Sequence, residues 1–547
     1  MMTKFIIVTG GVLSGLGKGV VTSSLGKLLK SKGLSVTAIK VDPYLNCDAG
    51  TMNPFEHGEV FVLRDGTEVD LDLGNYERFL DIDLCGDDNI TTGKVYRSVI
   101  DKERAGEYLG KTVQIIPHIT DEINRRVWNS ADRTDADIVL VEMGGTVGDI
   151  ESMPFLEASR QLHMEVGEDS KNCLFIHTTL VPVIDVVGEQ KTKPTQHSVQ
   201  ALREIGIEPD IVVGRSKNRL EESTKQKISL FCDVPKEAVI SSPNAENIYQ
   251  VPLILNEEGL TDYVMDKMGL HKLIKEKEGK EPEMRMDDWK EFLHNYENPE
   301  HEINIALVGK YCDLEDAYVS HEEALNHCWS ETRTKINIKY IESEELEEHD
   351  PHELLGDVEG ILIPGGFGTR GIQGKINAVN YARENKLPIL TICLGFQVSV
   401  IEFARNVLGY EDANSSEFNN ESPHPVIDLL PMQRGIDNMG GTMRLGAEKI
   451  YIDEDTKAHD IYGETVIEER HRHRYEVNLN YKDEMEENGM KFSGYSHNGK
   501  RMEILEVEDH PFFIGSQFHP EFQSRPMKPA PLFLAFVKAI LKEKDLN

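Results

Sequence analysis

The sequence has little cysteine, little tryptophan and no cysteine pair at C-x-x-C spacing. Its 547 residues include three tryptophans and seven cysteines, which are scattered along the chain and odd in number. This pattern argues against a disulfide framework and favours a reducing compartment. The cysteines stand at Cys47, Cys85, Cys173, Cys232, Cys312, Cys328 and Cys393.

Long apolar runs are also missing. No stretch approaches the roughly 18 consecutive apolar residues that a membrane span requires. The first residues show no charged leader that is followed by a long apolar region and a cleavage site. We therefore expect a cytoplasmic protein that has no membrane partner.

Basic residues are scarce relative to acidic ones. Lys and Arg total 59 against 95 Asp and Glu, which gives a net charge of −36. Such a charge repels nucleic acid, so a nucleic-acid ATPase is disfavoured. Any polyanionic substrate must therefore meet a local cluster of basic residues.

The length and the pattern of apolar runs predict two α/β domains, each a mostly parallel sheet covered by helices. A chain of 547 residues is too long for one core. Short β-rich runs alternate with helical patterns in both halves, which is typical of βαβ units. The predicted strands are Lys4–Thr9, Ser35–Val41, Ile138–Glu142, Cys173–Ile176, Ile211–Val213, Ala238–Ile240, Ile303–Val308, Ile336–Ile341, Gly360–Ile363, Pro388–Ile392 and Phe512–Ser516. The charged stretch 271–301, which contains few strand formers, is predicted to be a linker with a helix or two.

A glycine-rich turn, GGVLSGLGKG, follows the first predicted strand and precedes a helical pattern. Such a turn offers backbone N–H groups and a helix N-terminus to phosphate, and Lys18 adds a point charge. The spacing departs from the standard phosphate loop, since Val12 and Gly19 stand where Gly and Ser or Thr are usual. Alone, the motif is also compatible with an ordinary strand-to-helix turn.

Two carboxylates are candidates for holding Mg²⁺ beside that turn. The alternation of VDLDL over Val69–Leu73 predicts that Asp70 and Asp72 share one face of a strand, which is also typical of a solvated edge strand. Glu142 ends a buried run at the edge where α/β sheets bind ligands. Mg²⁺ favours a pair of carboxylates together with phosphate oxygens, so Asp72 and Glu142 fit a nucleotide triphosphate site.

A compact basic segment, KTKPTQ, spans Lys191–Gln196 in a region without strong periodicity. Pro194 excludes a helix interior there, and a solvated loop is the simplest interpretation. In so acidic a chain, Lys191, Lys193 and Lys227 are nevertheless candidates to receive a second triphosphate.

The second half carries the parts of a cysteine-nucleophile site. Cys393 lies between a predicted strand and a helix in PILTICLGFQ, close to the pattern of a nucleophile elbow, although a buried cysteine is the simpler interpretation of one thiol. His519 and Glu521 are two residues apart in QFHPEF, as a base and its orienting carboxylate would be. The glycine-rich PGGFGTRG over 364–371 supplies backbone N–H groups for an oxyanion hole.

A histidine- and arginine-rich stretch, ERHRHRYEVN over Glu469–Asn478, has two interpretations. In an extended conformation His471 and His473 share one face, which would suit a metal but lacks a third ligand nearby. Recognition of a substrate carboxylate by an arginine agrees better with the pattern.

Taken together, these segments resemble the CTP synthase family along nearly the whole chain. The most specific are KTKPTQHS, GGTVGDIES and DLDLGNYERF, and the second half alone is similar to class I glutamine amidotransferases. The resemblance implies an amidoligase domain of the P-loop type at 1–270, a linker at 271–301 and a glutamine amidotransferase domain at 302–547. Family members make CTP from UTP, ATP and glutamine through a 4-phosphorylated UTP.

The resemblance also implies roles for individual residues. Cys393, His519 and Glu521 would be catalytic, and Asp72 and Glu142 would hold Mg²⁺. ATP would contact Lys40, Asp72, Gly15, Leu16, Gly17, Lys18, Gly19 and Val20. UTP, or CTP as feedback inhibitor, would contact Ser14, Asp149, Ile150, Glu151, Lys191, Thr192, Lys193, Pro194, Thr195, Gln196 and Lys227. Glutamine would contact Gly366, Leu394, Gly395, Phe396, Gln397, Glu417 and Arg474. GTP as activator and a homotetramer are further implications.

Some positions depart from the family pattern. Gly15 stands where many members have serine, and Thr369 and Gln373 replace residues that are more often aromatic and acidic, in a region linked to GTP action. Pro243–Ala245 differ from the charged segment that is common on the adenine side. Two alternatives stay open at this point: another ATP-dependent amidoligase with a glutaminase half, and a non-catalytic nucleotide-binding scaffold or filament protein.

Overall fold

The computed structural model describes residues 3–50, 52, 58–167, 171–184, 188–277, 284–312, 314, 316–366, 368–429 and 443–546. By its contacts the chain divides into two compact units. Unit 1 comprises Met1–Thr51 and Leu71–Trp289, and unit 2 comprises Met52–Asp70 and Lys290–Asn547. These are bounds of contact units. The functional domains 1–270 and 302–547, with their linker, stay a prediction.

The described part of unit 1 is built on a seven-stranded sheet in which every neighbouring pair is parallel. The strand order is β11-β10-β7-β1-β6-β2-β5. The six apolar runs listed as strands for this half all form, with their ends shifted by at most a few residues. The strands are β1 (Lys4–Gly10), β2 (Val36–Asp42), β5 (Asn89–Thr91), β6 (Ile138–Met143), β7 (Cys173–Leu180), β10 (Ile211–Arg215) and β11 (Val239–Ser242).

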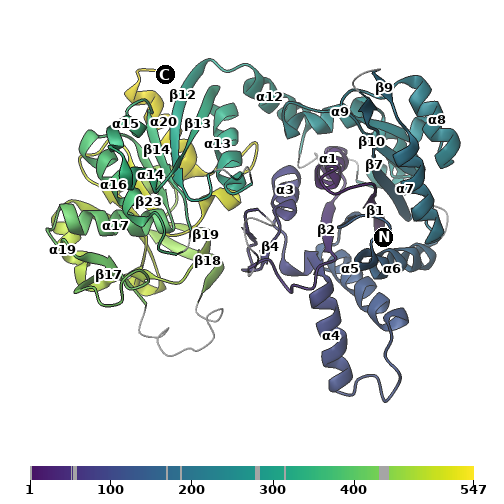
Figure 1. Ribbon diagram of the computed structural model, residues 1–547, viewed down its shortest axis with the longest axis horizontal. Coiled ribbons are helices and arrows are strands. Elements are labelled where there is room, and N and C mark those ends of the chain that lie inside the picture. Colours follow the sequence, from purple (N-terminus) through teal and green to yellow (C-terminus); the bar gives the residue numbers. More distant parts are fainter. Residues whose placement is uncertain are drawn as a thin grey trace. The chain divides into compact units, whose positions relative to one another are not determined.

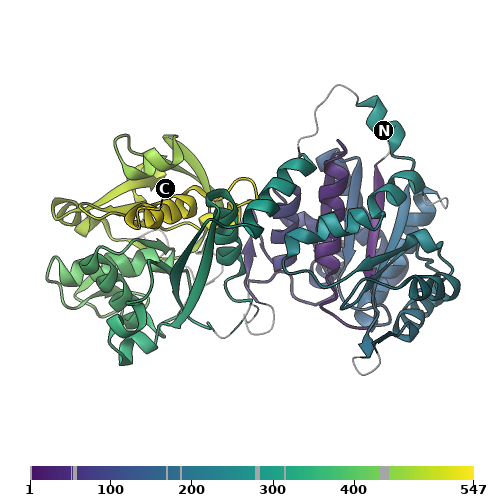
Figure 2. The ribbon, with the colours of Figure 1, turned by 90° about the horizontal axis from the view of Figure 1, so that it is seen from above.

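Helices cover both faces of this sheet. Helices α1 (Lys18–Lys30) and α9 (Val251–Glu257) are drawn above the strands in Figure 1, while α5 (Thr120–Thr134) and α6 (Met153–Val166) are drawn below them. Seen from above, α1 accordingly lies in front of the strands (Figure 2). Burial on both faces explains why every residue of β2 is buried and why β6 begins with the continuous apolar run IVLV. The remaining larger helices are α3 (Leu71–Leu80), α4 (Thr92–Arg104), α7 (Lys193–Glu204), α8 (Glu222–Cys232), α10 (Leu260–Lys267), α11 (His271–Glu276) and α12 (Met286–Glu297).

The described part of unit 2 contains a nine-stranded mixed sheet with the order β13-β12-β14-β15-β23-β22-β21-β18-β19. The first five strands are parallel, as predicted, and the other four pair antiparallel. The strands are β12 (His301–Gly309), β13 (Thr334–Glu342), β14 (Gly360–Ile363), β15 (Ile389–Ile392), β18 (Arg444–Ile452), β19 (Val466–His473), β21 (Met490–Ser496), β22 (Arg501–Val507) and β23 (Phe513–Ser516).

Alternate residues of β12 pack into two apolar clusters, one on each face of this sheet. Ala306 and Val308 pack with residues of α16 (Ile372–Asn385) and α17 (Leu394–Asn406). Ile305 and Leu307 pack with residues of α13 (Val319–Thr332) and α20 (Pro531–Glu543). A short hairpin from the first half of the sequence, β3 (Phe61–Val62) and β4 (Glu68–Val69), also belongs to unit 2. Smaller elements are β16 (Ala413–Ser415), β17 (His424–Asp428), β20 (Glu476–Val477), α14 (Glu345–Glu348), α15 (Pro351–Leu355), α18 (Lys457–Tyr462) and α19 (Lys482–Glu487).

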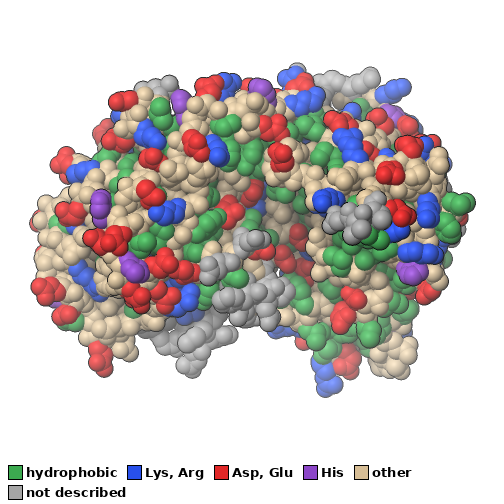
Figure 3. Space-filling model, turned by 45° about the horizontal axis from the view of Figure 1, so that its top comes forward, with side chains coloured by type: hydrophobic (Ala, Val, Ile, Leu, Met, Phe, Trp, Pro, Cys, Tyr) green, Lys and Arg blue, Asp and Glu red, His purple; other side chains and the backbone are tan. Residues whose placement is uncertain are grey.

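The surface agrees with the acidic composition. Asp and Glu side chains are spread among Lys and Arg over the face in Figure 3, with no broad basic field there. A helix with the length and apolar character needed to cross a membrane does not occur in the described part of the chain.

Candidate functional site

The predicted phosphate loop connects β1 to α1. Gly15 and Gly17 have φ of 74° and 79°, a region in which glycine is favoured. Gly17 is the N-cap of α1, so the backbone N–H groups that follow it have no partner within the helix. The Nζ of Lys18 donates to the carbonyl oxygen of Gly145 at 2.9 Å. The loop therefore has the local geometry that the sequence predicted for anion binding.

Two carboxylates converge on the start of α1. A Cβ on Gly19 would lie 2.4 Å from Oδ1 of Asp72 and 3.5 Å from Oε2 of Glu142, so glycine leaves room for both groups. The Nζ of Lys40 bonds Asp72 and lies 3.0 Å from Oε1 of Glu142. The structure thus brings together Gly19, Lys40, Asp72 and Glu142 from four separate segments.

The predicted strand across Val69–Leu73 was wrong. Strand β4 ends at Val69 and α3 begins at Leu71, which places Asp72 in the first turn of a helix. A carboxylate is favourable there because it faces the positive end of the helix dipole. The short alternation of VDLDL spans a strand end and a helix start, so it does not reflect one strand.

The charges around Glu142 are strongly coupled. Burial raises the pKa of Glu142, and it would lower that of Lys40, but Asp72 and Glu142 raise the Lys40 pKa well above its usual range. The hydroxyl of Tyr76 on α3 also donates to Glu142. Among the described residues no cluster of three or more His, Cys, Asp or Glu side chains could hold a metal. Two carboxylates still fit Mg²⁺, which completes its shell with water and phosphate oxygens.

The predicted pyrimidine-nucleotide residues lie in several segments of unit 1. Lys193 and Pro194 form the first turn of α7, where proline is tolerated. Lys191 pairs with Glu189 at 2.6 Å, and both Lys191 and Lys227 lower the pKa of Glu189. The charges of both lysines therefore act on the same carboxylate, that of Glu189. The buried pair Thr192 and Thr195, half-buried Gln196, and exposed Ser14, Asp149, Ile150 and Glu151 complete the predicted set.

A buried histidine that the sequence analysis missed connects β1 to α7. The two ring nitrogens of His177 lie 2.9 Å from Oγ1 of Thr9 and 2.6 Å from Oγ of Ser198. Burial, with a contribution from Lys18, lowers the pKa of His177 to about 3. The ring is therefore neutral and joins the strand before the phosphate loop to the helix that begins with the basic segment.

A cavity of about 180 Å³ adjoins the phosphate loop on the side where an adenine is expected. Leu16, Gly17 and Val20 line it together with Pro243 and Ala245, the residues that depart from the family pattern. Arg215 and Asn247 supply polar groups at its wall. The departure at 243–245 thus lies in the wall of the cavity beside the phosphate loop.

In unit 2, Cys393 lies at a sharp turn between β15 and α17. Its φ of 54° and ψ of −99° are strained for a residue with a side chain, as expected of a nucleophile elbow. The turn requires close packing, since a Cβ on Gly395 would lie 2.3 Å from the carbonyl oxygen of Ile363. The elbow predicted from PILTICLGFQ therefore forms.

His519 and Glu521 meet beside this cysteine. The Nδ1 of His519 lies 2.6 Å from Oε1 of Glu521, and both side chains are buried. Nε2 of His519 has no hydrogen-bond partner among the described residues. A Cβ on Gly365 would lie 2.9 Å from Cε1 of His519 and 3.5 Å from Cβ of Cys393, so both side chains border that glycine. The three predicted triad residues are thus brought together.

A cavity opens at the cysteine. Its described lining includes Gly366, Cys393, Leu394, Gln397, Glu417 and Arg474, together with Met443, His473 and Tyr475. Five of the seven residues predicted to contact glutamine therefore surround the nucleophile. Gly395 and Phe396 are buried in the first turn of α17 and do not appear in that lining.

Two lysines that the sequence analysis missed hold the glycine-rich loop 364–371. Lys375 is fully buried and donates to the carbonyl oxygen of Pro364 at 3.0 Å, while Lys310 donates to that of Gly368 at 2.8 Å. Burial lowers the pKa of Lys375 to about 7 and that of Lys310 to about 8. Within this loop Thr369 is exposed. Just after it, Oε1 of Gln373 accepts a hydrogen bond from Arg405 at 3.0 Å.

The histidines of the ERHRHRYEVN segment face an arginine. In β19, His471 and His473 are buried and lie 3.4 and 3.2 Å from the guanidinium of Arg444. Burial and Arg444 lower the pKa of His471 well below its usual value. The described residues therefore form an ion-pair network here, with Glu476 and Glu503 bonded to Arg444 at 2.8 and 2.9 Å. Arg474, at the end of the segment, lines the cavity at Cys393.

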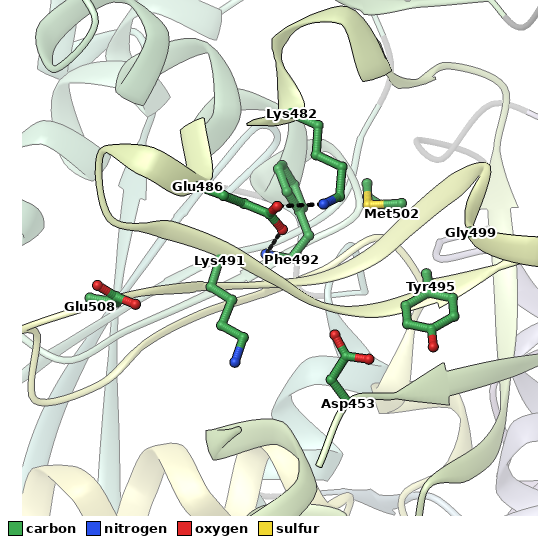
Figure 4. A pocket seen from close by; sticks show the side chains of 9 residues that line it. All are labelled: Asp453, Lys482, Glu486, Lys491, Phe492, Tyr495, Gly499, Met502 and Glu508. Carbon is green, nitrogen blue, oxygen red and sulfur yellow. Dashed lines mark hydrogen bonds and ion pairs between the residues drawn. The ribbon is translucent and has the colours of Figure 1, made fainter. Parts of the chain in front are cut away.

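A larger cavity of about 610 Å³ lies elsewhere in unit 2, between α19, β21 and β22. Figure 4 shows Lys482 paired with Glu486, which also accepts from the backbone N–H of Phe492. Among the described residues its lining contains acidic and basic side chains together but no cysteine or histidine. It is therefore separate from the candidate site.

Comparisons with known proteins match both halves of the chain to described families. Residues 4–270 match the family described as CTP synthase N-terminus, and residues 313–539 match that described as glutamine amidotransferase class-I. A CTP synthase of Archaeoglobus fulgidus is 57% identical over 539 residues, which cover 98% of each chain. A CTP synthase of Carboxydothermus hydrogenoformans is 55% identical over 545 residues, which cover 100% of each chain.

Among solved structures, the glutaminase domain of Trypanosoma brucei CTPS with bound acivicin is 41% identical, with a TM-score of 0.42. The match covers 44% of this chain and 94% of that chain. The relatives of full length are decisive, since they extend through both units at more than half identity. The chain belongs to the CTP synthase family.

Proposed function

We propose that this chain converts UTP to CTP, using ATP and ammonia that it releases from glutamine, in the synthesis of pyrimidine nucleotides. One observation carries the proposal: a phosphate-loop site with two convergent carboxylates and a Cys-His-Glu constellation occur in one chain of this family. A nucleotide site alone would not require a cysteine nucleophile, and a glutaminase site alone would not require a phosphate loop. A non-catalytic scaffold protein would not need the Cys-His-Glu constellation.

In the glutaminase reaction, the thiolate of Cys393 attacks the side-chain amide carbon of glutamine. His519 donates a proton to the leaving nitrogen, so that ammonia departs and a glutamyl thioester remains. Backbone N–H groups of Gly366 and Leu394 would stabilise the oxyanion. Water, with its proton taken by His519, then hydrolyses the thioester to glutamate. Gln397, Glu417 and Arg474 line the cavity that would hold the glutamine.

In the amidoligase reaction, the γ-phosphoryl group of ATP is transferred to the 4-oxygen of UTP. Ammonia then attacks C4, and phosphate leaves in place of the poorly departing oxygen. Residues 15–20 and Lys40 would bind ATP. Mg²⁺ on Asp72 and Glu142 would neutralise charge on the triphosphate. Lys40 would leave its present position between the two carboxylates or share them with the metal.

The finer partners rest on family resemblance. We propose that UTP, or CTP as inhibitor, contacts Ser14, residues 149–151 and 191–196, and Lys227. GTP would activate the enzyme, and a homotetramer would form. A cytoplasmic location fits the seven cysteines, none of which is paired in a disulfide in the described structure.

Product analysis tests the proposal. The purified chain is incubated with UTP, ATP, Mg²⁺ and glutamine, and the nucleotides are separated by chromatography. We expect CTP and ADP in equal amounts, and CTP again when an ammonium salt replaces glutamine. Absence of CTP with both nitrogen sources would overturn the proposal. Parallel reactions with GTP, and light scattering with UTP and ATP, test the activator and the tetramer.

A further inference from the structure

The hairpin β3–β4 is packed against the strands of the glutaminase unit, although its sequence lies within the match to the CTP synthase N-terminus family. The backbone N–H of Ala447 donates to the carbonyl oxygen of Arg64 at 2.8 Å. A Cβ on Gly446 would lie 2.5 Å from the backbone nitrogen of Gly66, so the hairpin and strand β18 are in close backbone contact. The hairpin is thus a fixed part of unit 2.

The hairpin reaches the base of the triad through aromatic and backbone contacts. Phe61 packs edge-on against Phe522 with ring centroids 5.0 Å apart, and Phe522 stacks on the ring of His519 at 5.1 Å. Arg470 donates to the carbonyl oxygen of Val62 at 3.0 Å. The backbone N–H of His519 in turn donates to the carbonyl oxygen of Arg470 at 2.8 Å.

A second route passes through Glu59 and helix α13. Oε2 of Glu59 accepts from the backbone N–H of Ser320 at 2.8 Å, and its own N–H donates to the carbonyl oxygen of Asp316 at 2.9 Å. Glu59 therefore stands at the first turn of α13, where a carboxylate is favourable. The neighbouring residue on that turn is His321.

His321 lies between Glu59 and the triad carboxylate. Its Nδ1 is 3.7 Å from Oε1 of Glu59, and its Nε2 is 3.5 Å from Oε1 of Glu521. The ring is 5% exposed and Glu521 is fully buried. Neither ring nitrogen of His321 has a hydrogen-bond partner among the described residues, and the same holds for Oε2 of Glu521. The ring is thus aimed at two carboxylates.

Charge explains such an arrangement better than packing does. Two carboxylates taken out of water are costly unless a cation faces them. Burial would raise the pKa of Glu521, but the charge of His321, followed by that of His519, lowers it. The other groups around the ring are Glu322 on the same helix, the edge-on ring of Tyr318 and the ring of Phe533 on α20. His519 contacts Glu521 at 2.6 Å, whereas Glu59 has His321 as its neighbour on this side of the ring.

We propose that His321 is a positioning residue of the glutaminase reaction: its ring, held between Glu59 and Glu521, fixes the carboxylate of Glu521. The inference rests on the proposed triad. Glu521 holds the ring of His519, so a fixed Glu521 keeps Nε2 directed at the reacting atoms. His321 itself does not line the cavity at Cys393 in the described structure.

The test measures steady-state glutamine hydrolysis by the full chain over a range of pH. His321→Leu replaces the ring with an apolar side chain of similar size. We expect kcat to fall on the order of tenfold with little change in the KM for glutamine. The acid limb of the pH profile should move to higher pH, because His321 lowers the pKa of Glu521 and its removal would raise it. If His321 acted only through packing, kcat would fall by the same factor at every pH and the acid limb would stay in place.

A double-mutant cycle with Glu59→Gln tests the link to the hairpin. Glu59→Gln should lower kcat in the wild-type background and have little further effect beside His321→Leu. His321→Gln, which keeps a hydrogen-bond donor facing the two carboxylates, should lower kcat less than His321→Leu does. Glu331→Gln, an exposed change on the same helix, is the matched control, and thermal unfolding reports on folding.

Unchanged kcat and an unmoved acid limb in a folded His321→Leu enzyme would overturn the inference. The inference would also be overturned if Glu59→Gln lowered kcat by the same factor in the wild-type and His321→Leu backgrounds. If His321→Leu fails to fold, His321→Gln and Glu59→Gln decide by the same readouts. Cys393→Ala is measured alongside: if it still hydrolyses glutamine, the proposed triad fails, whereas a dead Cys393→Ala beside a normal His321→Leu overturns this inference alone.

Discussion

The Nδ1 of His519 lies 2.6 Å from Oε1 of Glu521, and this contact sets the charge of the ring. Burial alone would lower the pKa of His519, but Glu521 and the Cys393 thiol raise it to about 10. The ring is therefore an imidazolium at neutral pH. It can donate a proton to the departing nitrogen as soon as the thiolate has attacked.

Glu521→Gln should remove the main cause of that raised pKa. The imidazolium would then lose its proton at a lower pH, so the alkaline limb of kcat/KM for glutamine should move to lower pH. We expect kcat to fall roughly 10²- to 10⁴-fold. The pH profile of glutamine hydrolysis measures both effects, with exposed Glu487→Gln as the control. An alkaline limb that stays in place would contradict this role of Glu521.

Cys393→Ala should separate the two nitrogen sources. Glutamine-dependent CTP synthesis should be lost, because no nucleophile remains at the elbow, while synthesis with an ammonium salt should continue in unit 1. Cys328→Ala is the matched control, since burial raises the pKa of that thiol and keeps it inert. Iodoacetamide should label Cys393 and spare Cys328. Normal use of glutamine by Cys393→Ala would refute the assignment of the nucleophile.

Asp72→Ala should abolish CTP synthesis with either nitrogen source and leave measurable glutamine hydrolysis. The change removes one of the two carboxylates that converge on Gly19 and leaves Lys40 with Glu142 and, at 4.0 Å, Asp42. CTP formation and glutamate release are measured on the same sample. Asp121→Asn, another acidic residue in a first helical turn, is the control. Full synthesis by Asp72→Ala would exclude the proposed metal role.

The parts of the site that the sequence could predict are local in the chain. The loop around Gly17, the elbow at Cys393 and the pair His519 and Glu521 each lie within about ten residues, so turn and strand patterns are enough to find them. Family resemblance then supplied their partners. The contact of Lys40 with Glu142 spans 102 residues, and no local pattern encodes it.

Other features were missed for identifiable physical reasons. Asp72 stands where a strand gives way to a helix, and five residues cannot distinguish a period of 2 from one of 3.6. The antiparallel strands β18 and β21 carry glycine and charged side chains, as in RLGAEKIYI and KFSGYS, and so lack the apolar runs that mark the parallel strands. His177 and His321 acquire their neighbours only by tertiary packing.

Lys27 in α1 is predicted to reduce stability in a pH-dependent manner. Its side chain is fully buried, Nζ has no hydrogen-bond partner among the described residues, and it lies 4.6 Å from the ring centroid of Trp289. Burial lowers the pKa of Lys27 from 10.5 to about 7. Between these values the unfolded chain binds more protons than the folded chain, so the lysine's cost is full below pH 7 and declines as pH rises toward 10.5.

Lys27→Met should therefore raise the apparent Tm, most at or below pH 7 and least near pH 10. The lost cation–π contact, worth about 1 kcal/mol, offsets only part of the gain, because each tenfold change in proton affinity corresponds to about 1.4 kcal/mol. Exposed Lys32→Met is the control, and we expect its Tm to match the wild type at each pH. Thermal unfolding at pH 6.5 and 9.5 measures the difference. A Tm gain that is equal at the two pH values would show that hydrophobic packing, and not the buried charge, sets the effect of Lys27.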